Sequence, residues 1–271
     1  MRAFAQILLS IFFILAYLFL VFGIIFKFQL LDYNFWLASF DKHNVYQNLA
    51  MVSKTSFEKQ VTSEGGKESD VQVLTDLITP ANAKDVMDRN LKNFLDFANG
   101  KVPQIYVYLP IDKVPKNLIP ASISGIKSDM LLSDLLTKFN FQDWQSLPFN
   151  TIYQLGKYSS YLFYGSLTLT ALITVLMVLV LESGKRFVAL GITFLLAGGI
   201  TLGLINLMGT LSTVLSANFS SHPSLGTMLM GVVLSPVVSD VAVPWKTVGF
   251  AMMVLGVGLF FVRKPGYNSL R

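Results

Sequence analysis

The sequence opens with an uncharged apolar stretch at residues 3–26, AFAQILLSIFFILAYLFLVFGIIF. As a helix rising 1.5 Å per residue it would span roughly 36 Å, more than the ~30 Å hydrocarbon core of a bilayer. A cleaved signal peptide has a shorter apolar core and a small-residue cleavage site, whereas this stretch continues into Lys27 without an A-x-A. We therefore expect residues 1–28 to be an uncleaved signal-anchor that leads the following segment across the membrane.

Three further apolar runs predict three more transmembrane helices, at residues 158–181, 187–208 and 245–263. The last run is short, so its helix is expected to cross near perpendicular or to begin before Trp245. The composition agrees with a polytopic membrane protein, because 53% of the residues are hydrophobic and 14% are charged, against about 25% charged in a typical soluble domain.

The distribution of charge predicts the topology of these spans. The chain carries a net charge of +5, yet residues 27–158 hold 14 basic and 14 acidic residues. Basic residues close to the ends of the spans are Arg2, Lys185, Arg186, Arg263, Lys264 and Arg271. By the positive-inside rule, both termini and the tail 264–271 are cytoplasmic, and residues 29–157 and 209–244 are extracytoplasmic. Since the basic residues flank spans, we expect no nucleic-acid partner.

The outer segment 29–157 is expected to be mainly helical with a short β element. Thr79-Pro80 is a typical helix start, and Gly100 lies where the C-terminal cap of that helix is needed. Residues 104–109 alternate between apolar residues and tyrosines, as a short strand does. The strand is expected to pair with residues 71–75, with residues 111–123 or with another protein, and a local hairpin is favoured. Ser128 is predicted to cap a helix that includes Met130 and Leu131. A later helix is expected to start near Asn150 and to continue into the second span.

The series NVYQNL, followed by LITPANAKDVMDRNLKNFLDFANGKVPQIYVYLPIDKVP, resembles uncharacterised bacterial multi-span membrane proteins. In that group an N-terminal anchor precedes a large extracytoplasmic domain, and more spans follow. The resemblance covers residues 1–120 and the order of the spans. It implies a bacterial membrane origin and carries no activity, so it assigns no functional residue.

Catalytic and metal-binding patterns are scarce. The chain has no cysteine and two histidines, and His43 and His222 are expected to be solvated or capping residues. Asp85, Asp88 and Asp96 interleave with basic residues, as on a solvated helix face with local ion pairs. No ionisable residue lies in the interior of a span, so a coupled pump is disfavoured. We predict no enzyme, no catalytic residue, no cofactor and no metal.

Glycines in the third and fourth spans indicate close helix packing, because small residues let helix backbones approach. These glycines are Gly191, Gly198, Gly199, Gly203, Gly249 and Gly256. Gly199 and Gly203 have the G-x-x-x-G spacing. Packing between the two spans is favoured over formation of a homo-oligomer.

Residues 224–243 are almost fully apolar although they follow a membrane exit. Leu225, Met228, Leu229 and Val232 share one helical face. We expect an interfacial helix, a re-entrant hairpin or a helix covered by the outer domain. An isolated interfacial helix would have a charged face, so this apolar face is expected to contact a partner protein or lipid.

The sequence thus predicts an all-α membrane protein with four transmembrane helices and a mainly helical extracytoplasmic domain. The first functional hypothesis is a non-enzymatic interaction protein of the plasma membrane, such as a sensor, scaffold or accessory subunit that binds an envelope protein. The alternative is a binder or carrier of a lipid or other apolar molecule, held in a groove between the helices and the outer domain.

Overall fold

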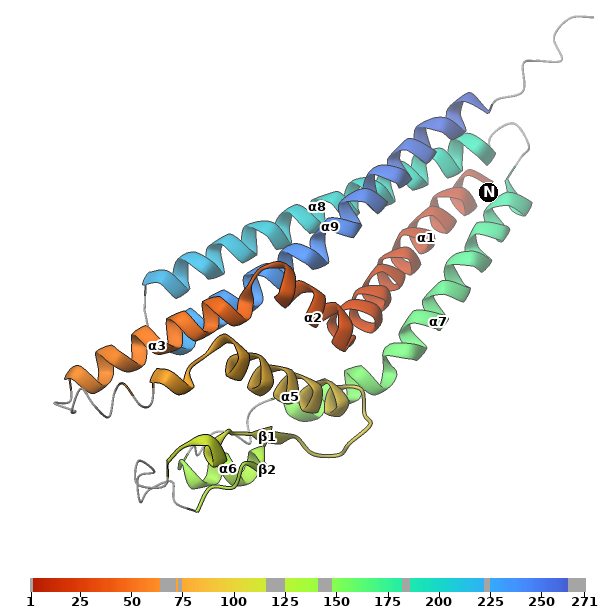
Figure 1. The fold of residues 1–271 in the computed structure, drawn as a ribbon. Coiled ribbons are helices and arrows are strands. Elements are labelled where there is room, and N and C mark those ends of the chain that lie inside the picture. The colour runs from red at the N-terminus through yellow and green to blue at the C-terminus, as the bar shows by residue number, and fades with distance from the viewer. Residues whose placement is uncertain are drawn as a thin grey trace, which may run out of the picture. The chain divides into compact units, whose positions relative to one another are not determined.

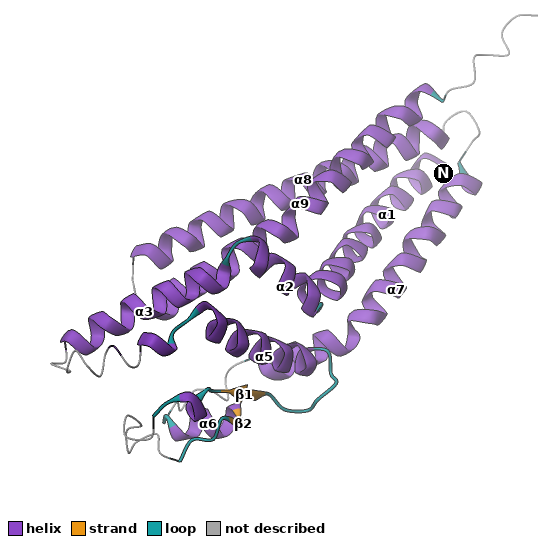
Figure 2. Cartoon of the chain, in the orientation of Figure 1, coloured by secondary structure: helices purple, strands orange, loops and turns teal. Residues whose placement is uncertain are grey.

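The structure is a computed structural model that describes residues 2–63, 72, 75–115, 125–140, 148–181, 186–221 and 225–262. Helices dominate this part of the chain, and its β structure is one short pair of strands (Figures 1 and 2). Four helices are long and apolar enough to cross a membrane, with candidate spans Phe4–Leu30, Phe149–Val180, Arg186–Thr210 and Gly231–Phe261. The chain is therefore a multi-pass α-helical membrane protein.

The chain divides into two compact units. Unit 1 contains Met1–Lys27, Ser159–Ser212 and Val238–Arg271, and unit 2 contains Phe28–Tyr158 and Thr213–Val237. Unit 1 is built from α1 (Arg2–Ile25) and from parts of α7 (Phe149–Val180), α8 (Arg186–Ser221) and α9 (Leu225–Phe261).

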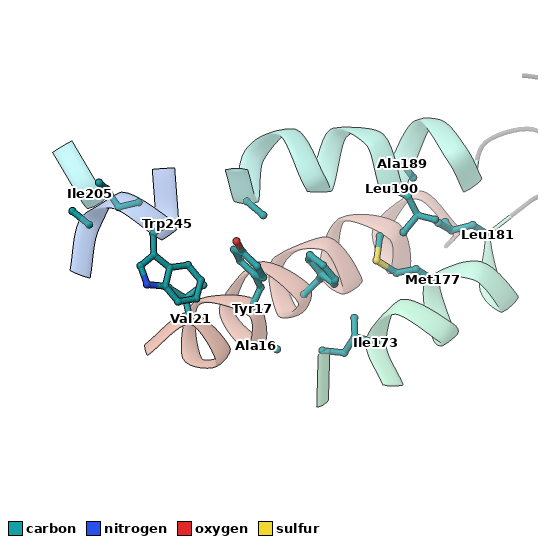
Figure 3. Packing of buried hydrophobic residues seen from close by; sticks show 13 residues of the cluster. Ala16, Tyr17, Val21, Ile173, Met177, Leu181, Ala189, Leu190, Ile205 and Trp245 are labelled. Carbon is teal, nitrogen blue, oxygen red and sulfur yellow. The ribbon is translucent and has the colours of Figure 1, made fainter. Parts of the chain in front are cut away.

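The core of unit 1 is a cluster of apolar side chains from all four of its helices (Figure 3). Tyr17 of α1, Met177 of α7 and Trp245 of α9 are among its buried members. Other large apolar side chains point outward, such as Phe19, Leu179 and Phe261. An apolar surface around an apolar core suits helices whose solvent is lipid.

Aromatic side chains lie at the end of the first span. A π-helical turn, Phe26–Leu30, follows α1. Within it, the Lys27 Nζ lies 4.2 Å from the centroid of the Tyr164 ring and 5.3 Å from that of Phe163. These are cation–π contacts, and tyrosines beside a lysine are typical of the headgroup region expected here.

Helices α8 and α9 are longer than the sequence predicts. The helix expected to end at residue 208 continues to Ser221. The fourth span is expected at 245–263, with a helix that crosses near perpendicular or begins before Trp245. The second alternative is confirmed, because α9 begins at Leu225. Residues 225–244 therefore form neither a hairpin nor a separate helix. Pro236 and Pro244 lie inside α9. Proline leaves a carbonyl one turn earlier without its helical donor, but a long membrane helix tolerates this where its surroundings satisfy the carbonyl.

Unit 2 contains the helices α2 (Tyr33–Lys42), α3 (Val45–Ser63) and α5 (Pro80–Ala98). The predicted start of α5 is confirmed, because Thr79 Oγ1 accepts a hydrogen bond from the backbone N–H of Asn82 at 3.2 Å. The predicted cap at its other end is also confirmed. Gly100 has φ +72° there, a left-handed conformation that glycine adopts without strain.

The two strands, β1 (Tyr106–Tyr108) and β2 (Asp129–Leu131), are antiparallel, with Val107 opposite Met130. The expected partners 71–75 and 111–123 are therefore wrong. The expected helix start at Ser128 is also wrong, since Met130 and Leu131 are in β2 and α6 spans Leu132–Lys138. Ser128 Oγ instead donates to Asp112 Oδ1 at 3.0 Å. Pairing with β1 satisfies backbone groups that a lone strand would leave open.

Candidate functional site

Unit 1 has hydrogen bonds between its helices. Ser10 and Thr193 hydroxyls are 2.8 Å apart, and Thr201 Oγ1 donates to Tyr17 Oη at 3.3 Å. These contacts join α1 to α8, which is a known role of hydroxyl side chains in membrane helices. Sequence patterns did not single out these hydroxyls as contacts between helices.

A small apolar cavity of about 120 Å³ lies near these hydrogen bonds. Its lining includes Val21, Thr201, Ile205 and Trp245, from α1, α8 and α9. Sites for small-molecule ligands usually measure about 300–1,000 Å³. This cavity is therefore too small to hold a lipid chain.

Four of the six predicted packing glycines lie at a contact between α8 and α9. A Cβ added to Gly191 would lie 2.7 Å from the carbonyl oxygen of Gly256, and one added to Gly198 would lie 2.7 Å from that of Gly249. Gly191 and Gly198 are seven residues apart on α8, and Gly249 and Gly256 are seven residues apart on α9, so the glycines of each helix recur on one helical face. Two antiparallel helix backbones approach closely along this face.

Gly199 and Gly203 are not part of this contact. A Cβ on either glycine would have no neighbour within 4 Å. The G-x-x-x-G pair thus lies on a different face of α8 from the contact with α9. Since 100° of rotation separates successive residues of a helix, Gly199 is turned away from the face that Gly198 occupies.

The predicted partner face of residues 224–243 is described only in part. Val232 is half-buried in α9. The side chains of Leu225, Met228 and Leu229 lie outside the described residues, although their backbone belongs to the same helix. His222 also lies outside them, and His43 is the C-terminal cap residue of α2.

Within the part of the chain that the structure describes, unit 2 has two hollow surfaces that are larger than the cavity of unit 1. One is an apolar groove of about 550 Å³, which we call the α3–α5 groove. Leu49, Ala50 and Ser53 of α3 form one wall, and α5 forms the other. The α5 residues in the lining are Asn82, Ala83, Val86, Met87, Asn90, Leu91 and Phe94. No ionisable side chain is present among the described lining residues.

Most polar side chains of this groove are already bound within the chain. Asn82 Nδ2 donates to the Leu77 carbonyl at 2.8 Å. Asn90 donates to the Tyr108 carbonyl at 2.9 Å and accepts from the Tyr108 N–H at 2.7 Å. Because these groups are satisfied, the groove offers a predominantly apolar surface to an occupant. Sequence patterns did not reveal this role of Asn90, since β1 lies 16 or more residues away.

A network of charges and hydroxyls holds α2, α3 and α5 together. Tyr46 Oη donates to Asp88 Oδ1 at 2.6 Å, and Lys84 Nζ lies 3.2 Å from Asp88 and 3.4 Å from Asp41. Burial, together with the hydrogen bond to Asp88, raises the pKa of Tyr46 well above its usual range. Tyr46 therefore stays protonated as a donor, which suits a structural role.

The other predicted carboxylates also have cationic partners. Asp85 contacts Arg89 at 2.7 Å and Lys113 at 3.1 Å, and Asp96 contacts Lys101 at 2.8 Å. Hydrogen bonds from Lys113, which has the larger effect, and from Arg89 lower the pKa of Asp85. Within the described residues, no group of three or more His, Cys, Asp or Glu side chains could hold a metal ion.

No family model, curated protein or solved structure matches the chain. Its function must therefore be inferred from its own geometry. The α3–α5 groove is the candidate site, because it combines an apolar lining, two helical walls and polar side chains that are already satisfied.

Proposed function

We propose that the protein is a membrane-anchored interaction protein whose unit 2 binds an apolar helix face of an envelope protein in the α3–α5 groove. The observation that carries this proposal is the apolar lining of that 550 Å³ groove. Exposed apolar grooves of soluble regions mark association sites. On this proposal the four spans serve as the anchor, and the protein acts as a sensor, scaffold or accessory subunit.

The form of the groove favours a helical occupant. Its long walls are α3 and α5, and amphipathic helices bind in such grooves through apolar side chains at helical spacing. The satisfied amides of Asn82 and Asn90 leave few hydrogen-bonding groups for an extended strand, which binds through its backbone. We therefore expect recognition by apolar anchors, with little dependence on salt.

The proposed topology places unit 2 on the extracytoplasmic side of a plasma membrane. The support is the set of basic residues near the ends of the spans, among them Arg2 and Arg186, which the positive-inside rule assigns to the cytoplasm. The link between the second and third spans would then be a short cytoplasmic segment. A signal received by unit 2 would reach the cytoplasm through the helices or through the partner.

Binding of a lipid in the groove is the main competitor to this proposal. The 120 Å³ cavity of unit 1 offers it no support, because that cavity is smaller than typical ligand sites. An acyl chain in the α3–α5 groove would satisfy the same apolar lining, so the experiment must separate lipid from protein.

The test is purification of the full chain from its native membrane in mild detergent, followed by mass spectrometry of whatever stays bound. Ala83→Glu places a carboxylate in the groove. Ala81→Glu makes the same change two residues away on α5, at an exposed position outside the described lining. Circular dichroism and thermal melting of both variants would verify that they fold.

We expect a stoichiometric protein partner that is retained by the wild type and by Ala81→Glu and lost from Ala83→Glu. A photo-crosslinker at Ser53 should label a helical segment of that same partner. Retention of the partner by Ala83→Glu would refute the groove as its binding site. Recovery of a lipid without any protein, sensitive to Ala83→Glu, would refute the interaction proposal in favour of a lipid binder.

A further inference from the structure

A second cavity in unit 2 differs in chemistry from the groove. It measures about 570 Å³ and lies between the end of α5, the loop that precedes β1, the end of β2 and the starts of α6 and α7. Residues in its lining that bear aromatic or polar side chains are Phe97, Gln104, Ser133, Phe149, Asn150 and Tyr153. None of its described lining residues also lines the α3–α5 groove, so the two sites are separate.

The polar groups of this cavity are available to a ligand. In the described part of the chain, the side-chain amides of Gln104 and Asn150 and the hydroxyl of Tyr153 make no hydrogen bond. Each amide offers two donors and an acceptor, and the phenol offers one donor and an acceptor. This arrangement is the opposite of the groove, where Asn82 and Asn90 are bound to backbone groups.

The cavity has no Asp, Glu, His, Lys or Arg side chain among its described lining residues. An ionised ligand would thus lose hydration without gaining an opposite charge. A neutral ligand with several hydrogen-bonding groups is the better match.

Aromatic faces complete the site. The Phe97 and Tyr153 rings are 5.5 Å apart and tilted by 41°, and Phe149 belongs to the same lining. The negative face of an aromatic ring attracts the weakly positive C–H groups of a neutral ligand. A pyranose ring has such C–H groups on its faces and hydroxyls around its edge, which amides can bind.

We propose that this cavity is a binding site for a neutral saccharide, held by Gln104 and Asn150 at its hydroxyls and stacked on the Phe149 and Tyr153 rings, with the buried Phe97 ring packed against Tyr153. The volume of 570 Å³ falls within the range of small-ligand sites. This inference is independent of the α3–α5 groove. It gives unit 2 a second ligand of a different class.

The test is isothermal titration of the full chain with the neutral disaccharides chitobiose and maltose, with glucosamine and glucuronate as charged comparisons. The detergent must lack a sugar headgroup, such as an amine oxide, because a maltoside would compete. The test variant is Gln104→Ala with Asn150→Ala, and Gln154→Ala is the matched control at an exposed α7 position outside the described lining.

We expect a neutral disaccharide to bind, and the double variant to weaken its binding by about tenfold or more, as the loss of two neutral hydrogen bonds predicts. Gln154→Ala should bind like the wild type. Tyr153→Leu should also weaken binding, since it removes a stacking ring. Absence of binding to both disaccharides, equal binding by the double variant, or preference for a charged sugar would overturn the proposal.

Discussion

Replacement of Gly198 by alanine should destabilise the membrane unit, whereas the same change at Gly199 should not. A Cβ at Gly198 would lie 2.7 Å from the Gly249 carbonyl oxygen and 2.8 Å from Met253 Cγ. The methionine side chain can adjust, but the carbonyl belongs to the backbone of α9. The two helices must therefore separate, and the contacts along their shared face weaken.

The expected magnitude follows from the cost of overpacking. Inserting a methyl group into a well-packed contact costs about 1–3 kcal/mol. At Gly199 the added methyl meets nothing within 4 Å, and alanine favours helix over glycine by up to about 1 kcal/mol. The two variants should consequently differ in free energy of unfolding by about 2 kcal/mol or more, with opposite signs relative to the wild type.

Unfolding of the purified chain in mixed micelles, followed by circular dichroism, measures this difference. Gly198 and Gly199 are adjacent in α8, so depth in the membrane and helix length are matched. Equal stabilities of the two variants would refute the assigned face. Loss of stability confined to Gly199→Ala would instead favour the G-x-x-x-G face as the contact, either within the chain or between copies.

Two further predictions concern unit 2. Gly156→Ala should destabilise it strongly, because the added Cβ would collide with the Ala98 carbonyl at the end of α5. Gly165→Ala, also on α7, is the control, because its Cβ would meet nothing within 4 Å. Thermal melting of both variants checks this prediction. The stability of unit 2 should also depend on pH through Asp85, whose pKa is lowered by hydrogen bonds from Lys113 and Arg89. A lowered folded pKa contributes stability above the unfolded pKa of about 3.9, and that contribution is lost as pH falls through the folded value. Asp85→Asn should flatten this acid-side loss in a pH series of melting curves, and an unchanged slope would contradict the assignment.

Local signals in the sequence predicted much of unit 2. Thr79 and Gly100 mark the ends of α5, because a capping hydroxyl and a left-handed glycine act within a few residues of the backbone groups they serve. The partner of β1 was not predictable in this way. Met130 and Leu131 have apolar side chains that also suit a helix, and the choice depends on a strand more than 20 residues away.

The candidate sites depend still more on distant contacts. Asn90 resembles any polar residue of a solvated helix in the sequence, yet its amide is bound to Tyr108. Gln104 and Asn150 are equally inconspicuous, and they line the same cavity only because the chain returns at the start of α7.

The sequence by itself determined that four helices are apolar enough to cross a membrane, because hydrophobicity summed over some twenty residues is a local property. The glycines of the third and fourth spans also indicate, from the sequence alone, that the backbones of these two helices can approach a neighbouring helix closely. Only the tertiary structure decided that Gly198, rather than Gly199, faces α9. The reason is that both positions have the same local chemistry, and their difference arises from the register of two helices packed against each other.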